Sequence, residues 1–408
     1  MTERISGSYI RLVLGVGRHD ADYVDAYYGP PHLKEEAERA NLSLAQIRAS
    51  AVSTLEELAS IAPSPTGELE RLRHAYLLRQ LESLVARTEI LEGKKLTFDE
   101  ESRALYDAVA PTHSESYFQA LVKELDGLLP GTGQVPERFD SYRKNFVLPK
   151  EKLDVVFTTA VAESRKRTLE RISLPPDESF VIEYVTGKSW SGYNWFKGNC
   201  HSLIQINTEL PITIDRAVDL ASHEGYPGHH VYNSLLETNL VRERGWWEFS
   251  VYALFSPQSL IAEGTANYGI PMAFPGEERV EFEQEVLFPL ASLDGREAEH
   301  YYRVFDAFQK LAYAGNEAAR RYLNGDISRE AAVDWLIRYA LMSPERAAQR
   351  TRFFDQYRSY VINYNLGQDM VGRYIQSRVG TAANPEKRWK IFGELLERPM
   401  IPSLLERD

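Results

Sequence analysis

Three of the nine histidines in this 408-residue chain fall within one short run beside a glutamate. The run is SHEGYPGHH, from Ser222 to His230. A lone histidine is more often structural than a metal ligand. Burying several imidazoles beside a carboxylate, however, is costly unless a positive group compensates, and a divalent metal ion does so directly. The cluster therefore predicts a metal site.

The spacing within the run departs from the usual zinc-peptidase pattern, HExxH. In that pattern two histidines lie one helical turn apart, and the glutamate between them activates water. Here the residue four positions after His223 is Pro227, which cannot bind a metal and which interrupts a helix. For His229 to reach the same ion as His223, the helix must bulge or restart at Pro227-Gly228. We expect such a break.

A third ligand is needed, because a catalytic zinc ion usually has three protein ligands and one position open to water. Glu263 is the candidate, since it lies in the apolar, helix-like segment SLIAEGTANYG. The alternative is a solvated glutamate on a helix surface. The prediction is one Zn²⁺ per chain.

The surrounding chain is predicted to be mainly helical. Apolar residues recur at helical spacing from about Leu33 to Leu91, and another helix is expected over about 151–172. The Pro- and Gly-rich stretch 129–139 indicates a boundary or a long surface loop. We divide the chain into an N-terminal helical region, 1–140, and a catalytic metal-binding region, 141–408, packed as one body.

Two short segments favour β-strands. Phe180–Val185 and Ser202–Asn207 are rich in β-branched residues, and a Gly- and Trp-containing loop, 186–199, is expected between them. From Ile212 onward the chain is predicted to be mostly helical. The fold class is therefore mainly α, with a small antiparallel β element near the site.

Composition excludes several classes of partner. The net charge is −12 and no run of Lys and Arg is present, so we expect no nucleic-acid binding. No apolar run reaches membrane-spanning length, and the first residues lack the pattern of a secretory leader. Cys200 is the only cysteine, which excludes an intrachain disulfide. We expect a cytoplasmic protein that does not contact membranes.

HEGYPGHH followed by AEGTANY resembles an uncharacterised bacterial family of metallopeptidases with the signature HExxPGHH and an EGxA segment. That family is similar in fold to the helical thermostable metallocarboxypeptidases and to the neurolysin and thimet oligopeptidase group. The resemblance implies a gluzincin-type site with two histidines and one glutamate as ligands, and it implies that Glu224 is the general base. An oxyanion donor is also implied, for which Tyr364, Tyr360 and His230 are candidates.

The resemblance also bears on which of two adjacent histidines binds the metal. Consecutive side chains on a helix point about 100° apart, so His229 and His230 cannot both face one ion. In the related peptidases the second ligand belongs to a Gly-His pair followed three residues later by an aromatic residue or histidine. Gly228-His229 followed by Tyr232 matches this pattern. His229 is therefore preferred, and His230 is expected to line the cleft or to form a hydrogen bond nearby.

Three further residues and one strand are also candidates for a role at the site. Arg352 and Arg358 would receive a substrate carboxylate or pair with acidic neighbours. Asp219 is a candidate to orient an imidazole. The strand Ser202–Asn207 either offers its edge to a substrate or forms part of a core hairpin.

The function favoured by these patterns is that of a zinc-dependent metallohydrolase, of carboxypeptidase or oligopeptidase type, acting on a peptide or small amide. The alternatives are a zinc hydrolase of a non-peptide amide or ester and a non-catalytic metal-binding helical protein. A di-iron carboxylate protein would need two Glu-x-x-His pairs. The sequence shows one, Glu297 with His300.

Overall fold

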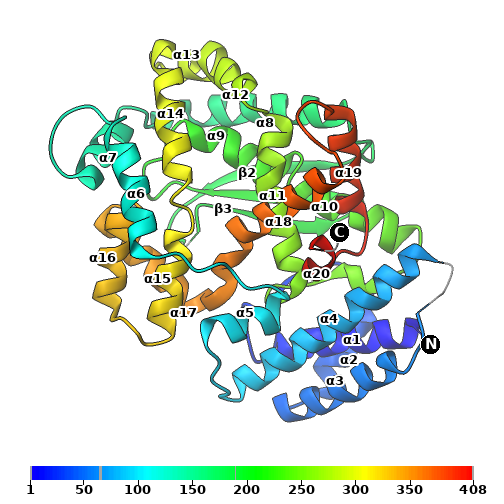
Figure 1. Ribbon diagram of the computed structural model, residues 1–408. Coiled ribbons are helices and arrows are strands. Elements are labelled where there is room, and N and C mark those ends of the chain that lie inside the picture. The colour runs from blue at the N-terminus through cyan, green and yellow to red at the C-terminus, as the bar shows by residue number, and fades with distance from the viewer. Residues whose placement is uncertain (1, 64–66, 189, 407–408) are drawn as a thin grey trace.

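The computed structural model describes residues 2–63, 67–188 and 190–406, and most of them are helical (Figure 1). Within these ranges no helix has both the length and the apolar content needed to cross a membrane. The N-terminal part contains α1 (Thr2–Val16), β1 (Val24–Tyr27), α2 (Pro31–Ala40), α3 (Leu44–Ala59), α4 (Glu68–Leu91), α5 (Phe98–Tyr106), α6 (Glu115–Asp126) and α7 (Val135–Lys144).

The central part holds the strands and the elements that carry the predicted site. These are η1 (Lys150–Lys152), α8 (Leu153–Leu169), β2 (Ser179–Val185), β3 (Gly192–Gly198), β4 (His201–Asn207), α9 (Asp215–Leu220), η2 (Ala221–Gly225), α10 (His229–Leu236), η3 (Glu237–Arg242), η4 (Trp247–Ser250), β5 (Val251–Ala253) and α11 (Pro257–Ala273).

The C-terminal part is helical throughout. It contains α12 (Glu277–Phe282), η5 (Glu283–Leu287), α13 (Phe288–Leu290), η6 (Gly295–Glu297), α14 (Ala298–Gln309), α15 (Ala314–Leu323), α16 (Arg329–Tyr339), α17 (Pro344–Tyr357), η7 (Arg358–Val361), α18 (Ile362–Ser377), α19 (Pro385–Glu397) and α20 (Pro402–Leu405). The mainly helical fold with a small sheet is confirmed.

The three-stranded sheet has the order β2-β4-β3. β4 pairs in parallel with β2 and antiparallel with β3. Both predicted strands are therefore present, and the antiparallel pair is made by a third strand. The expectation of a loop is wrong for 192–198, where the aromatic residues of GYNWFKG pair with β4. The glycines at both ends of this strand are typical of turns and hid the strand in the sequence.

The strand order also decides whether the strand Ser202–Asn207 has a free edge. β4, the strand Ser202–Asn207, has a neighbour on each side, so the hypothesis that it offers an edge to a substrate is wrong. β2 and β3 are the edge strands instead. A second sheet, in which β1 pairs antiparallel with the three-residue β5, was not predicted because both strands are very short.

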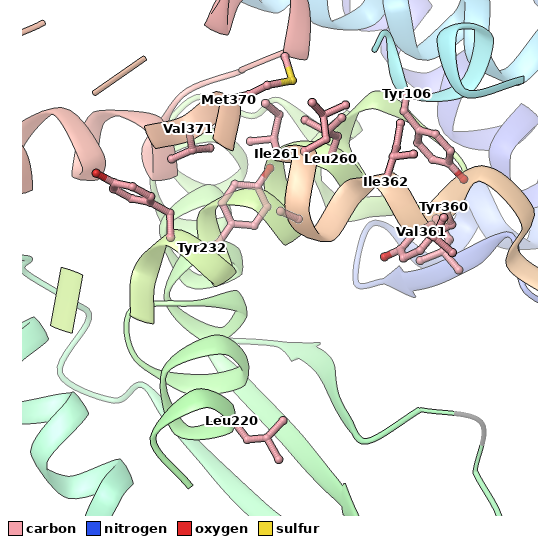
Figure 2. Packing of buried hydrophobic residues seen from close by; sticks show 14 of the residues in the cluster. Tyr106, Leu220, Tyr232, Leu260, Ile261, Tyr360, Val361, Ile362, Met370 and Val371 are labelled. Atoms are coloured by element: carbon pink, nitrogen blue, oxygen red, sulfur yellow. The ribbon is translucent and has the colours of Figure 1, made fainter. Parts of the chain in front are cut away.

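Close packing of α11 against α18 brings two distant segments together. A Cβ atom on Gly264 would lie 2.5 Å from the backbone carbon of Gly367, so glycine at this crossing allows the two helices to approach. Figure 2 shows Leu260 and Ile261 of α11 beside Ile362 of α18. All three side chains are buried. This packing places η7 and the start of α18 next to the face of α11 that carries Glu263.

Candidate metal centre

The helix that carries the HEGYPGHH run is interrupted at the predicted place. α9 continues into η2, a π-helical turn that contains His223 and Glu224, and the chain restarts as α10 at His229. Gly228 stands at the break, where a Cβ atom would collide with the carbonyl oxygen of His223. The wider turn and the restart together compensate for the two extra residues of the spacing. His223 and His229 consequently lie side by side.

Three potential ligand atoms converge at this point. The Nε2 atoms of His223 and His229 are 3.1 Å apart, and Glu263 Oε2 lies 3.3 Å from the first and 3.7 Å from the second. Ligands of a tetrahedral zinc ion, bound at about 2.1 Å, are about 3.4 Å from one another. Glu263 Oε2 is buried and has no hydrogen-bond partner among the described residues. The separations and the unpartnered oxygen fit a metal ion.

Neighbouring side chains orient two of these ligands. Asn267 donates from Nδ2 to the carbonyl oxygen of Tyr364, at 3.0 Å, which turns its Oδ1 toward His223 Nδ1, at 2.9 Å. His223 then carries its proton on Nδ1 and presents the Nε2 lone pair to the centre. Tyr360 donates its hydroxyl to Glu263 Oε1 at 2.7 Å. Burial raises the pKa of Glu263, but the contacts with His223 and His229 outweigh it and hold that pKa well below its ordinary value.

Glu224 lies beside this cluster and is buried. His223, Glu224 and His229 each offer a ligand atom within 4.8 Å of the others, a grouping that is able to hold a metal ion. Burial raises the pKa of Glu224 to about 7, with His229 acting against the shift and Glu263 adding to it. A carboxylate with a pKa near neutrality is well suited to accept and return a proton.

Sequence reasoning missed two residues of the site. Asn267 lies one helical turn after Glu263, so its position on the same face of α11 was a usable signal. Asp25, on β1, lines the same cavity and accepts a hydrogen bond from the Tyr193 hydroxyl. Burial raises the pKa of Asp25 to about 6, and the Tyr193 hydrogen bond and His229 oppose that rise. No local pattern marked Asp25, because it approaches the centre from a distant part of the chain.

The centre opens into a cavity of about 570 Å³. One wall is the stretch from Trp190 to Asn194, which leads into the edge strand β3, and another is α17. Asn194 donates a 2.7 Å hydrogen bond to the backbone oxygen of Glu224, which ties β3 to the π-helical turn. Tyr360 and Tyr364 also line the cavity. The volume is typical of a site for a small molecule or short peptide.

Several predicted residues lie elsewhere. His230 is fully buried and does not line the cavity, because its ring is held between Ser202 and Glu178. Of its two expected roles, the hydrogen-bonding one is observed. Asp219 orients no imidazole, since its carboxylate pairs with Arg279 and Arg216.

Neither of the two arginines proposed to bind a substrate carboxylate, Arg352 and Arg358, lines the cavity. Arg358 pairs with Glu101 at 2.6 Å, and Arg352 is exposed. Glu297 is exposed, whereas His300 contacts the Tyr142 hydroxyl and the carbonyl oxygen of Leu128. Nothing in the described part of the chain therefore supports a di-iron pair there.

Comparison with known proteins shows the fold alone. No family model matches the chain, and no curated protein matches it. A candidate lipoprotein from Colwellia psychrerythraea superimposes with a TM-score of 0.53 and 12% identity, over 91% of this chain and 71% of that one. A candidate lipoprotein of unknown function from Shewanella oneidensis gives 0.49 and 12%, over 91% and 75%. The M32 carboxypeptidase from Deinococcus radiodurans R1 gives 0.40 and 14%, over 99% and 92%. Neither of the two lower scores carries an argument about function.

Proposed function

We propose that this chain is a zinc-dependent hydrolase of peptide bonds, with His223, His229 and Glu263 as ligands and Glu224 as general base. The supporting observation is the convergence of two imidazole nitrogens and one unpartnered carboxylate oxygen next to a second, buried carboxylate. Two nitrogens and one oxygen in this arrangement are the donor set of many catalytic zinc sites. Mere metal binding has no need of Glu224 in addition.

A divalent ion at this centre supplies Lewis-acid polarisation of a carbonyl group and makes a water molecule more acidic. Glu224 accepts the proton of the attacking water and delivers it to the departing amine. Asn267 and Tyr360 hold His223 and Glu263 in place throughout.

Tyr364 is the proposed donor to the oxyanion. The Tyr360 hydroxyl already donates to Glu263, and His230 does not line the cavity, so Tyr364 is the remaining candidate that lines it. Burial and the negative charge of Glu263 raise the pKa of Tyr364 well above its ordinary value, which keeps the phenol protonated and able to donate.

The edge strand β3 supports a peptide as substrate. An extended peptide can add its backbone to a free strand edge, which orients the scissile bond without regard to side chains. The residues that lead into this strand line the same cavity as the ligands.

Two measurements test the proposal. Elemental analysis of the purified protein should find about one zinc ion per chain. A mixture of synthetic peptides should be cleaved by the wild-type protein, as read by mass spectrometry, and left intact by Glu224→Gln. If the protein cleaved only non-peptide amides or esters, those compounds and not peptides would be its substrates. A wild-type protein that binds zinc but hydrolyses none of these compounds would overturn the enzymatic assignment.

A further inference from the structure

An arginine without a counter-charge lines the cavity. Arg350 contacts no acidic group within ion-pair distance among the described residues, and its Nε is buried without a hydrogen-bond partner. Burial lowers its pKa, and the neighbouring Tyr364 opposes that shift. A partly buried cation that lacks an anion is costly, so the site favours an anionic ligand.

Aromatic rings hold the guanidinium in place. Its central carbon lies 4.5 Å from the ring centroid of Phe353, 5.6 Å from that of Phe354 and 6.0 Å from that of Tyr364. Such contacts compensate a cation partly and leave its N–H groups available. Arg350 is therefore fixed in orientation before any ligand arrives.

Other arginines of the cavity differ from Arg350 in having acidic or backbone partners. Arg143 pairs with Asp215, and Arg216 pairs with Asp219, each at 3.3 Å. Arg346 donates to the backbone oxygen of Pro211 at 2.9 Å. Arg143 and Arg216 are thus paired with carboxylates that line the same cavity. Among them, Arg350 has neither an acidic nor a backbone partner within the described residues.

The position of Arg350 relates it to the candidate metal centre. Arg346, Arg350 and Phe353 recur at helical spacing on the face of α17 that lines the cavity. Tyr364, which Arg350 contacts, feels the negative charges of both Glu263 and Glu224. Tyr364 is thus a neighbour both of the cation and of the carboxylates of the centre.

We propose that Arg350 binds a carboxylate of the substrate, so that the cavity selects peptides whose chain ends next to the scissile bond. This inference rests on the proposed peptidase function and names its substrate class. A guanidinium receives a carboxylate through two parallel hydrogen bonds, a geometry that an amide does not reproduce. A cavity of about 570 Å³ also suits the end of a peptide better than the middle of a folded chain.

The test measures binding separately from hydrolysis. Zinc-loaded Glu224→Gln protein is titrated calorimetrically with N-acetyl-alanyl-phenylalanine, with its C-terminal amide, and with N-acetyl-alanyl-glutamate α-amide. The free acid should bind about 10- to 100-fold more tightly than its amide. Adding Arg350→Gln should abolish the difference, Arg350→Lys should retain part of it, and Arg352→Gln, on the exposed face of the same helix, should leave it unchanged. Circular dichroism and thermal melting verify that each variant is folded.

Each outcome bears on one proposal at a time. Equal binding of acid and amide, an acid preference that survives Arg350→Gln, or no measurable binding of the acid would overturn the role of Arg350. Arg350-dependent binding of the glutamate α-amide would support the carboxylate contact and assign it to a side chain. Discrimination by Arg350 in a wild-type protein that cleaves no peptide would leave this site standing and refute the peptidase proposal.

Discussion

His229 and His230 are adjacent in the sequence, yet they belong to two chemically different clusters. His229 faces His223 and Glu263 across a gap in which Glu263 Oε2 has no hydrogen-bond partner in the described structure. His230 lies fully buried, with Nδ1 2.8 Å from Ser202 Oγ and Nε2 2.9 Å from Glu178 Oε2. The two rings diverge because successive residues of α10 point in different directions.

The cluster around His230 is satisfied by the protein itself. Glu178 also accepts hydrogen bonds from the Tyr226 hydroxyl at 2.5 Å and from Arg165 at 2.7 Å. Serine, histidine and glutamate in a row have the composition of a hydrolytic triad, but none of the three lines the cavity. The comparison shows that residue types alone do not identify a reactive site. What separates the clusters is whether polar atoms are left without partners next to accessible space.

Glu224→Gln should produce the largest effect and tests the reactive side of this comparison. The amide cannot accept the proton of water, so hydrolysis should fall by about 10²- to 10⁴-fold while zinc content stays near one per chain. The exposed Glu277→Gln serves as a matched control and should behave like wild type. Substantial activity in Glu224→Gln would assign the base to another residue.

Glu178→Gln should act on stability instead of metal binding. Removing the charge leaves His230 and Arg165 without their anionic partner, which should cost about 3–5 kcal/mol of unfolding free energy. Zinc affinity should not change. Urea denaturation measures the first quantity and chelator competition the second, with the exposed Glu170→Gln as control. If Glu178→Gln lost zinc without losing stability, the cluster around His230 would contribute to metal binding, and this prediction would be wrong.

The stability difference between the wild-type protein and Glu178→Gln should also depend on pH. Burial raises the pKa of Glu178, but hydrogen bonds from His230, Tyr226 and Arg165 outweigh it and hold the pKa below its ordinary value of 4.5. A carboxyl with a depressed folded-state pKa stabilises the fold above its unfolded pKa, and this contribution is lost as the pH falls. The stability difference between wild type and Glu178→Gln should therefore narrow below about pH 4.5. A difference that stays constant at low pH would contradict this account.

Glu263→Ala and His229→Ala should each weaken zinc binding by about 10²- to 10³-fold, because each removes one of the three protein ligands that supply the binding free energy. His230→Ala provides the comparison, since it should destabilise the fold and leave zinc affinity unchanged. Competition with a chromogenic chelator measures all three. If His230→Ala lost zinc and His229→Ala retained it, the choice between the two histidines would be reversed.

The elements that sequence predicted well are those with local signals. Helical periodicity located α2 to α4 and α8, and β-branched runs located β2 and β4. The proline four residues after His223 predicted the break that the structure shows. Each of these inferences needs only neighbouring residues, because periodicity and turn chemistry are local properties.

What escaped prediction depends on contacts between distant segments. Asp25 reaches the cavity through the pairing of β1 with β5, which no local pattern reveals. Arg350 and Arg352 are two residues apart, and only the packing of α17 determines which one faces the cavity. The roles of His223, Glu224, His229 and Glu263 stay predictions until a metal and an activity are measured.

Asn267→Ala should have the smallest effect and tests how strongly the centre depends on its supporting residues. Asn267 contacts the Nδ1 atom of His223, and not the Nε2 atom that faces the centre. The substitution therefore removes a group that orients the His223 ring, but it removes no metal ligand. Loss of such a partner typically weakens metal binding by about 10- to 100-fold. Asn267→Asp should restore part of the affinity, because a carboxylate accepts the Nδ1 proton but cannot donate to the Tyr364 carbonyl oxygen. A purely packing role would instead be rescued by Asn267→Leu. Zinc titration of the three variants separates these cases, and full affinity in Asn267→Ala would show that helix packing alone orients His223.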